Sequence, residues 1–478
     1  MKLSLAVAIL LPLAASSQTV LYSNPQGCID PSKYDDDTDF FPQKFVPDVT
    51  TDYLAVEYHN TYKIVTNVLN EKSYLFYQCG TDPPVDEVSS GRHHVVLSIP
   101  HAGKVVVTET PQIPSLELLS KRSEIGAYVG EPKLVSSPCL SSLMADGVVE
   151  TIYYPDDPWN QTLNDEGVAE FLAGNPDAIV LAGAFGNVDG ERHIVDPQTQ
   201  ERTAVATFDW LGMYAAMFNL EGVANDIISK AKARYECAAE NAAYLTADVP
   251  EDERPKILWA EYYDGLGWSV ADCPAWDAAY YCEYAHHCEA SIVSRPEGVG
   301  FSESFGGTEE YWYLTDDEFL MLGKDVETWV YPSPTFGDVY AMKAEILDQF
   351  VSVRNGRVYD TQGQGPYGWY EQRLAEYDVV VLDVCSIVGT ASPAVMHDRR
   401  WLRSYFTEAI GSPGTCDDGD VFAAWVPAEA RCDPIATTTS DDQTGPSPAD
   451  PVATSAAFSI VGFVPATVVA WIASIFLA

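Results

Sequence analysis

The chain is poor in positive charge: it carries 27 lysine and arginine residues against 70 aspartate and glutamate residues, for a formal net charge of −43. Binding to nucleic acid depends on lysine and arginine side chains that neutralise phosphates. The composition therefore excludes a nucleic-acid partner, and it disfavours adsorption to anionic membrane surfaces. Two explanations of the acidic excess stay open: a solvated shell suited to a salty exterior, where charges are screened over roughly 10 Å, or attraction of a cationic or metal-bearing ligand.

Local catalytic motifs are also lacking. The sequence contains no Gly-x-Ser-x-Gly elbow and no His-Glu-x-x-His pair, the patterns of serine hydrolases and zinc peptidases. It shows no internal repeats of the kind that adhesive proteins use. Paired carboxylates that act as acid and base leave no local signature, so a secreted glycoside hydrolase with sugars on its aromatic loops stays open as an alternative. Otherwise the sequence favours a binding protein over an enzyme.

Only eight histidines are present. Direct coordination of a metal ion needs several His, Asp, Glu or Cys side chains that converge on one point. The adjacent His286 and His287 stand beside Cys288, which we expect in a disulfide. His93 and His94 point to opposite faces of an expected strand. We therefore expect no direct metal site, and we favour recognition of a metal that is already chelated.

Both ends of the chain have the character of targeting segments. Residues 1–17 combine a lysine, an apolar run and small polar residues, as a secretory signal peptide does. A polar linker at 434–455 leads into an apolar run at 456–478. No lysine or arginine follows that run, which favours a glycosylphosphatidylinositol-anchoring signal; a single-span tail anchor is the alternative. We expect the mature protein on the extracellular face of the plasma membrane, with endocytic vesicles as a second location.

All ten cysteines lie between these end segments, in a compartment that permits disulfides. Their even number allows up to five bridges. We expect Cys416 to pair with Cys432. We also expect one bridge between two of the three cysteines Cys273, Cys282 and Cys288. The triplet that begins at Asn160 is an N-glycosylation acceptor, which agrees with a surface glycoprotein.

Residues 40–207 are predicted to form one α/β lobe. The segment 53–68 alternates Val, Tyr and Ile with other residues and predicts a strand, and 73–80 predicts a second strand that pairs with it as a hairpin. Val105–Val107 predicts a further strand, which a helix follows. The apolar run in NPDAIVLAG, residues 175–183, is typical of a buried parallel strand.

Residues 208–245 contain no proline and predict one long helix between two lobes. Apolar residues recur there at steps of three and four and share one face: Leu220, Ala224, Ile227, Ala231, Tyr235, Ala238 and Ala242. Strands and helices then alternate again, so 250–433 predicts a second α/β lobe. Its expected strands lie in 255–265, 326–337 and 356–361, with a helix near 341–350 and a helical end over 398–410. The predicted fold class is α/β, with two Rossmann-like lobes joined by one long helix.

The order of these pieces resembles the class III periplasmic-binding-protein-like family, the substrate-binding proteins of siderophore, heme and cobalamin uptake. GKVVVTETPQIPSLELLSKRSEIGAYVG (103–130) is similar to that family's opening strand, helix and second strand. GNPDAIVLAG (174–183) is similar to a later strand, and 208–235 to the lead into the interlobe helix. NGRVYDTQGQGPYGWYEQR (355–373) resembles the passage from a late strand into a ligand-facing loop. The ten cysteines, the acidic stretch at 283–312 and the anchor-like tail depart from bacterial members.

The resemblance implies binding rather than catalysis, with a chelated metal held between the lobes. A chelate presents an apolar shell with a few exposed oxygens, so its receptor needs aromatic walls and one or two donors. In open α/β sheets, ligands bind beyond the carboxyl ends of the strands. By position, the predicted ligand-binding residues are Tyr262, Tyr263, Trp268, Phe336, Tyr367, Trp369, Tyr370 and Arg373.

Alternative roles stay open for these residues. The aromatic rings can line a ligand site or pack in the core of the lobe. The Arg373 guanidinium can donate to hydroxamate or carboxylate oxygens of a ligand, or pair with the acidic surface of the protein.

The predicted function is capture of ferric siderophores of hydroxamate type by a lipid-anchored surface protein without a covalently bound cofactor. Heme and cobalamin are the nearest alternative ligands. The expected partners, besides the membrane, are a surface ferric reductase or an endocytic receptor that takes over the chelate.

Overall fold

The computed structural model describes residues 22–435, except 35–36, 158–159, 184–189, 304–310, 394–396, 417–420 and 429. The predicted signal peptide (1–17) and apolar tail (456–478) lie outside the described residues, as does nearly all of the predicted linker. Among the residues that are described, no helix has the length and apolar character needed to cross a bilayer.

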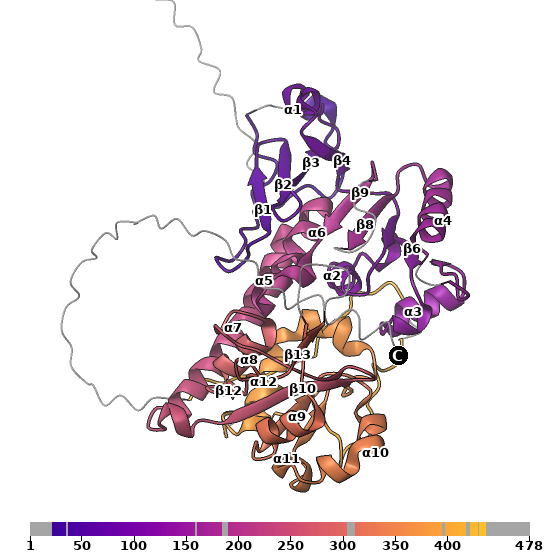
Figure 1. The fold of residues 1–478 in the computed structure, drawn as a ribbon. Coiled ribbons are helices and arrows are strands. Elements are labelled where there is room, and N and C mark those ends of the chain that lie inside the picture. Colours follow the sequence, from indigo (N-terminus) through magenta and orange to yellow (C-terminus); the bar gives the residue numbers. More distant parts are fainter. Residues whose placement is uncertain are drawn as a thin grey trace, which may run out of the picture.

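The described chain forms two α/β lobes with a long helix, α7 (Glu221–Leu245), along one side of both (Figure 1). The lobe that comes first in the sequence contains a parallel sheet and a smaller sheet, and the second lobe is built on a mixed sheet. The predicted fold class, with two α/β lobes and one connecting helix, is confirmed.

The main sheet of the N-terminal lobe is parallel, with strand order β7-β6-β5-β8-β9. These strands are β5 (Val105–Val107), β6 (Ile125–Val129), β7 (Glu150–Ile152), β8 (Ile179–Gly183) and β9 (His193–Asp196). Helices α2 (Gln112–Leu118), α3 (Pro138–Ala145) and α4 (Gln161–Gly174) connect them. In β5, Val105 and Val107 pack into the large core while Val106 packs into a second core on the other face. Both faces are therefore covered, which explains the continuous apolar runs.

A second sheet, of strand order β1-β2-β3-β4, contains β1 (Leu54–Tyr58), β2 (Tyr62–Asn67), β3 (Lys72–Gln78) and β4 (His93–Ile99), with α1 (Val85–Ser90) before β4. The prediction of a single strand over 53–68 was wrong. The amide of His59 donates to the carbonyl of Tyr62 at 2.8 Å and closes a turn, so the segment forms the antiparallel pair β1 and β2.

The predicted helix over 208–245 is interrupted. It consists of α6 (Leu211–Phe218) and α7, preceded by α5 (Ala204–Asp209). Asn219 has a φ of 58° and ends α6, because asparagine tolerates the left-handed region better than most residues. The predicted apolar face of α7 is confirmed. Its members Ala224, Ala231, Tyr235, Ala238 and Ala242 are buried, and Leu220 and Ile227 pack against the same core.

The C-terminal lobe has the strand order β11-β10-β15-β16-β17, and β12 also pairs with β10. The strands are β10 (Lys256–Tyr263), β11 (Gly267–Val270), β12 (Ser291–Ile292), β15 (Thr328–Tyr331), β16 (Val358–Asp360) and β17 (Arg403–Ser404). Its helices are α8 (Tyr280–His287), α9 (Asp316–Gly323), α10 (Phe336–Leu347), α11 (Val351–Arg354) and α12 (Tyr377–Val388), and β13 (Phe301–Glu303) pairs with β14 (Tyr311–Tyr313).

The helical end predicted over 398–410 was wrong, because that segment holds β17 instead. The buried carboxylate of Asp383 accepts the amides of Arg400, Trp401 and Leu402, at 3.2, 2.6 and 2.8 Å. A carboxylate from α12 therefore takes three donors that a helix would need, and sequence periodicity does not reveal such a distant partner.

Five disulfides join the ten cysteines: Cys28–Cys79, Cys139–Cys416, Cys237–Cys432, Cys273–Cys282 and Cys288–Cys385. The local bridge predicted within 273–288 is confirmed. The predicted Cys416–Cys432 pair was wrong, because the C-terminal segment runs back along the molecule and each of its cysteines meets an element from the first half of the chain.

Asn160, the predicted glycosylation site, caps the N-terminus of α4. Its Oδ1 accepts the amide of Leu163 at 3.2 Å, and its Nδ2 donates to Asp157 at 2.8 Å. Its glycosylation stays a prediction.

Candidate functional site between the lobes

The loops at the carboxyl ends of strands from the two lobes meet across the molecule. Glu371 follows β16 of the C-terminal lobe, and Ser136 and Ser137 follow β6 of the N-terminal lobe. The amides of the two serines donate to the two carboxylate oxygens of Glu371, each at 2.8 Å. We call the segments after β6 (130–137), β10 (264–266) and β16 (361–373) the strand-end face. In open α/β sheets this edge is where ligands bind.

The contact at Glu371 is buried and acidic. Burial raises the pKa of Glu371 to about 8, and the nearby charge of Glu117 raises it too, while the serine amides act in the opposite direction. One oxygen of Glu117 accepts from Arg122 Nε and from Ser137 Oγ, both at 2.5 Å. The other Glu117 oxygen is buried without a hydrogen-bond partner. Glu371 is thus buried near the negative charge of Glu117, and the guanidinium of Arg122 pairs with Glu117.

On the N-terminal lobe, Tyr128 in β6 is surrounded by acidic groups. Burial raises the pKa of its hydroxyl, and the charges of Glu371, Glu109 and Glu131 raise it further. Gly130 follows directly with a φ of 140°, and a Cβ there would lie 2.9 Å from the Tyr128 hydroxyl oxygen. Glycine is therefore required where the chain leaves β6 and passes the ring.

On the C-terminal lobe, Glu261 lies near the carboxyl end of β10. It is only 6% exposed, and Oε1 accepts the hydroxyl of Tyr263 at 2.8 Å. Burial raises the pKa of Glu261 to about 7. The sequence analysis did not select this residue, because burial of a carboxylate cannot be recognised in the sequence.

Arg373 is buried, and its guanidinium stacks on two rings rather than on a surface carboxylate. Its centre lies 4.5 Å from the ring of Tyr280 and 4.8 Å from the ring of Trp369, and its Nε donates to the carbonyl of Trp369 at 3.2 Å. It also contacts the hydroxyl of Tyr284, whose pKa it lowers against the larger effect of burial. The prediction of a pairing with the acidic surface was therefore wrong, and a ligand contact stays a prediction.

Three of the predicted ligand-binding rings have no exposed surface and pack in the core: Trp268, Phe336 and Trp369. Trp268 stacks on Phe319 at 4.0 Å and donates through Nε1 to Asp316 at 2.8 Å. Phe336 packs edge-on against Trp329. As placed in the structure, these rings support the lobe and do not line a ligand site, which corrects the prediction for them.

The other predicted rings keep part of their surface exposed: Tyr262, Tyr263, Tyr367 and Tyr370. Tyr370 donates to the carbonyl of Pro332 at 3.0 Å. A hydrogen bond to Glu131 raises the pKa of Lys133 in the opposite lobe, and Tyr367 adds a smaller contribution in the same direction. Tyr262 lies under the ammonium of Lys343, 4.3 Å from its ring centre. A role of these four in ligand binding stays a prediction.

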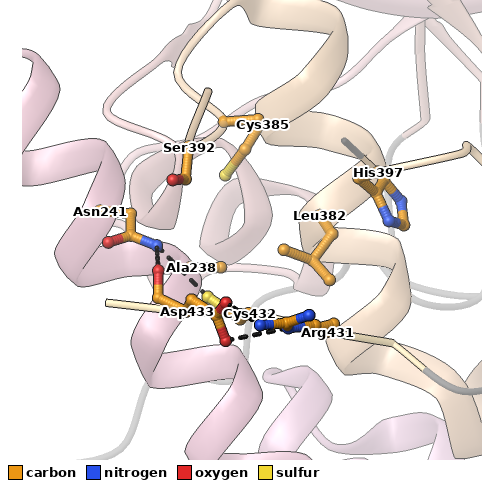
Figure 2. Close-up of a pocket in the computed structure, with 10 residues that line it drawn as sticks. Ala238, Asn241, Leu382, Cys385, Ser392, His397, Arg431, Cys432 and Asp433 are labelled. Carbon is orange, nitrogen blue, oxygen red and sulfur yellow. Dashed lines mark hydrogen bonds and ion pairs between the residues drawn. The ribbon is translucent and has the colours of Figure 1, made fainter. Parts of the chain in front are cut away.

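A small hollow lies away from the strand-end face, between α7, α12 and the C-terminal segment (Figure 2). Asn241 in α7 donates to the carbonyl of Asp433 at 3.0 Å and to Cys432 Sγ at 3.3 Å. His397 reaches Asp383 in α12 at 2.5 Å. These polar groups bond to one another and hold the C-terminal segment and His397 against α7 and α12. They therefore have structural roles.

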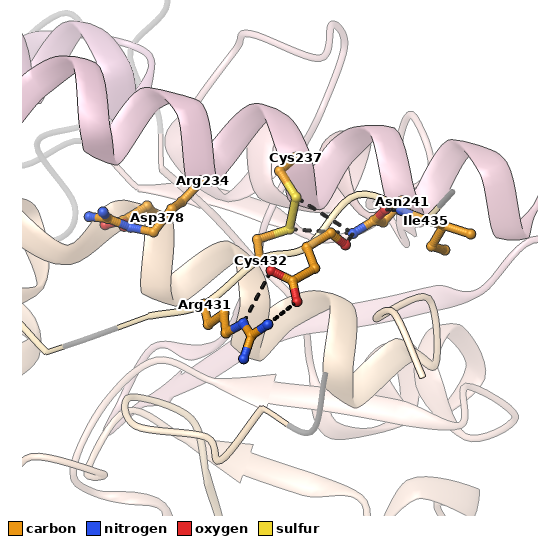
Figure 3. Close-up of a disulfide and its surroundings, with 8 residues drawn as sticks. Arg234, Cys237, Asn241, Asp378, Arg431, Cys432 and Ile435 are labelled. Atoms are coloured by element: carbon orange, nitrogen blue, oxygen red, sulfur yellow. Dashed lines mark hydrogen bonds and ion pairs between the residues drawn. A yellow bond between two sulfur atoms is a disulfide. The ribbon is translucent and has the colours of Figure 1, made fainter. Parts of the chain in front are cut away.

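The same region contains a seam, which we define as α7, α12 and residues 431–435 (Figure 3). The Cys237–Cys432 disulfide joins α7 to the C-terminal segment. Arg234 Nε donates to Asp378 of α12 at 2.5 Å, and the rings of Tyr235 and Tyr377 lie 5.0 Å apart. The seam therefore combines a covalent bond, an ion pair and apolar packing.

The described residues contain no group of three or more His, Cys, Asp or Glu side chains that could hold a metal ion. His287 packs against the ring of Tyr235 at 4.5 Å, and burial lowers its pKa. His93 contacts Glu87 at 2.9 Å and Ser73 at 2.7 Å. Both histidines thus have packing or hydrogen-bond partners within the protein.

Comparisons with known proteins give distant relatives. No protein-family model matches the chain. An uncharacterized lipoprotein of Methanocaldococcus jannaschii is 18% identical over 338 residues, which cover 68% of this chain and 74% of that protein. A periplasmic heme-binding protein from Pseudomonas aeruginosa matches with a TM-score of 0.42 and 11% identity, covering 63% of this chain and 96% of that one.

A periplasmic vitamin B12 binding protein of Vibrio cholerae matches with a TM-score of 0.38 and 12% identity, covering 60% of this chain and 97% of that chain. Similarity at this level leaves the function of the present chain to be derived from its own residues.

Proposed function

We propose that this protein is a binding protein that captures a ferric siderophore of hydroxamate type at the strand-end face. One observation carries the proposal: the amides of Ser136 and Ser137 in the N-terminal lobe meet Glu371 of the C-terminal lobe, so segments that follow parallel strands of both sheets converge on one place. Ligands of open α/β sheets bind at that edge, and two such edges can enclose a ligand from both sides.

The chemistry of this face suits a rounded organic shell. Partly exposed tyrosine rings supply apolar contact, and hydroxyl groups supply hydrogen bonds. Tyr263 and Tyr370 stand on the C-terminal lobe, Tyr367 reaches across to Lys133, and Tyr153 lies beside the same lysine. A chelate offers hydroxamate oxygens to donors and hydrocarbon to rings, so both kinds of group are used.

Recognition of the chelate rather than of bare iron is part of the proposal. A bare ferric ion would need a set of oxygen or nitrogen ligands at one point, whereas the acidic groups at this face are separated between the lobes and several are hydrogen-bonded to the protein. The siderophore itself would supply the iron ligands. Attachment to the cell surface by a C-terminal lipid anchor, and transfer to a reductase or endocytic receptor, complete the proposed role.

The test uses residues 22–435, which contain both lobes and all five disulfides. Tryptophan fluorescence and titration calorimetry are recorded against a ferric hydroxamate, heme, cobalamin and a soluble ferric salt. Saturable binding of the ferric hydroxamate with one site per chain, and no saturable binding of the ferric salt, is the expected result.

Other outcomes decide between the alternatives. Preferred binding of heme or cobalamin would replace the siderophore by that ligand. Absence of binding by all chelates would contradict the proposal, and turnover of a panel of glycosides would favour a hydrolase instead.

A further inference from the structure

In the described part of the interior, Glu261 is a buried carboxylate without an ion pair, and it accepts a single hydrogen bond. Six other buried acidic side chains form ion pairs with a lysine, arginine or histidine: Glu117, Glu221, Asp360, Glu376, Asp378 and Asp383. Four more lack such a partner but accept at least two hydrogen bonds each: Asp196, Glu201, Asp209 and Glu371. Glu283 accepts one, from the amide of Ala204. Glu261 has neither a cation nor a second donor and accepts only from Tyr263.

The lack of a cation and of a second hydrogen-bond donor at a buried carboxylate destabilises the folded protein. A carboxylate that loses water needs hydrogen-bond donors or a positive charge in exchange, and an unmet group is destabilising, more so when it is charged. Among the other buried carboxylates of the described chain, all but Glu283 have a cation or a second donor. Glu261 therefore leaves an acceptor available next to the strand-end face.

The groups around Glu261 are aromatic. The ring of Tyr263, whose hydroxyl donates to Glu261, lies 5.7 Å from the ring of Tyr313. Burial raises the pKa of the hydroxyls of Tyr280, Tyr313, Tyr331 and Tyr370, and the negative charge of Glu261 raises each further, while Arg373 acts in the opposite direction on Tyr280 and Tyr370. Tyr263 completes the group. Aromatic faces attract a cation, and the attraction is stronger when water is excluded.

The charges farther out are mixed, with acidic groups in excess. Across the strand-end face, Glu109, Glu131 and Glu371 act on Tyr128, and Lys133 pairs with Glu131. The guanidinium of Arg373 lies over the rings of Tyr280 and Trp369 and forms no ion pair with Glu261. The unpaired charge of Glu261 therefore favours a ligand that carries positive charge over one that carries negative charge.

We propose that Glu261 and the surrounding tyrosines form a subsite for a protonated amine on the bound chelate. The ammonium group would donate to the free oxygen of Glu261 and contact the rings of Tyr263 and Tyr370, while the iron-bearing part lies toward the N-terminal lobe. This inference rests on the proposed function and narrows its ligand class to chelates with a pendant ammonium. Anionic catecholate chelates are disfavoured at the same face.

Two chelates that differ only in this charge provide the test. Ferrioxamine B is a linear ferric hydroxamate with a pendant ammonium, and its N-acetyl derivative is neutral at the same atom. Calorimetry on residues 22–435 should show the ammonium form binding about tenfold tighter or more, as a charged hydrogen bond in a dry site predicts. Glu261→Gln should bring the ratio of the two affinities to about one, mainly by weakening the ammonium form.

One further variant controls for net charge. Glu166→Gln removes the same charge from an exposed position on α4 and should leave the ratio unchanged. Circular dichroism and thermal melting establish that each variant is folded.

The outcomes separate this inference from the proposed function. If neither chelate binds the unmodified protein, the proposed function is wrong. If both bind with equal affinity, or if Glu261→Gln weakens both to the same extent, the chelate site stands and the ammonium subsite is wrong. The affinity ratio of the unmodified protein is decisive even if Glu261→Gln does not fold.

Discussion

The two lobes meet in two regions that differ in kind. At the seam, the Cys237–Cys432 disulfide, the Arg234–Asp378 pair and the rings of Tyr235 and Tyr377 join α7 to α12 and the C-terminal segment. At the strand-end face, Glu371 accepts from two backbone amides, beside the Glu117–Arg122 pair, and the Cys139–Cys416 disulfide joins the adjoining helix α3 to the C-terminal segment.

The difference indicates which region is fixed and which is adapted to bind. The polar groups of the seam form ion pairs and hydrogen bonds with one another. The strand-end face keeps several acidic groups with raised pKa values, Glu371 and Glu261 among them, and tyrosines with exposed surface. Groups whose ionisation is disfavoured by burial are frequent at functional sites. We infer that the seam holds the lobes while ligand contacts are made at the other region.

Removal of the seam disulfide should have the largest effect. Cys237→Ser with Cys432→Ser opens a link across 195 residues, for which chain entropy predicts a loss of about 5 kcal/mol in unfolding free energy. Cys273→Ser with Cys282→Ser opens a link across 9 residues and should cost about 3 kcal/mol. Guanidinium denaturation measures both. Equal losses of unfolding free energy would show that the Cys237–Cys432 disulfide stabilises the fold no more than the local Cys273–Cys282 disulfide does.

Loss of the seam ion pair should have the second largest effect on stability. Arg234→Ala leaves the buried carboxylate of Asp378 without its cation, and we expect a loss of about 3 kcal/mol. The matched control is Arg202→Ala, whose partner Asp52 is exposed and whose loss should cost less than about 1 kcal/mol. Thermal melting of the two variants should differ clearly; similar melting temperatures would contradict a stabilising seam.

The strand-end face should respond to pH. The pKa of Glu371 in the folded state, about 8, lies above its usual value of 4.5, so its contribution to stability is complete below pH 4.5 and is lost as the pH rises through 8. Glu371→Gln removes this titration but also one hydrogen bond to a serine amide. The unfolding free energy of the unmodified protein relative to Glu371→Gln should therefore fall between pH 5 and pH 8, by on the order of 1 kcal/mol per pH unit, and level off above pH 8. If the unfolding free energies of the unmodified protein and Glu371→Gln differ by the same amount at every pH in this range, the assigned burial of Glu371 is wrong.

The smallest effect is expected from a single hydroxyl at the ligand-binding region. Tyr370→Phe removes the hydrogen bond to the Pro332 carbonyl, which predicts a loss of about 1 kcal/mol and a weaker chelate affinity. Tyr340→Phe removes an exposed hydroxyl that donates to Asp348 and should change neither value measurably. If the two variants show the same unfolding free energy in denaturation and the same chelate affinity in calorimetry, a ligand-binding role of the strand-end face is contradicted.

Periodicity and composition were enough to predict the two α/β lobes, because buried parallel strands such as β8 and the apolar face of α7 leave local patterns. They failed where a distant partner decides the local structure. Asp383 takes amides from Arg400 to Leu402, and Cys416 pairs with Cys139. Neither partner can be recognised from its sequence neighbours.

The candidate site was predicted in its location but less well in its residues. The segments after β10, β15 and β16 were expected to face the ligand, and aromatic content then favoured Trp268, Phe336 and Trp369. Large rings are the side chains that a core buries first, and these three are buried completely. The acidic residues Glu261 and Glu371 were not selected, because only the folded chain shows that they are removed from water.

The most direct test of the account is hydrogen exchange of residues 22–435 with and without a saturating ferric hydroxamate. We predict slower amide exchange after binding at 130–137, 264–266 and 361–373, with the seam unchanged. Protection confined to the seam or to the hollow around Asn241, or no protection anywhere despite saturating chelate, would contradict a ligand site at the strand-end face.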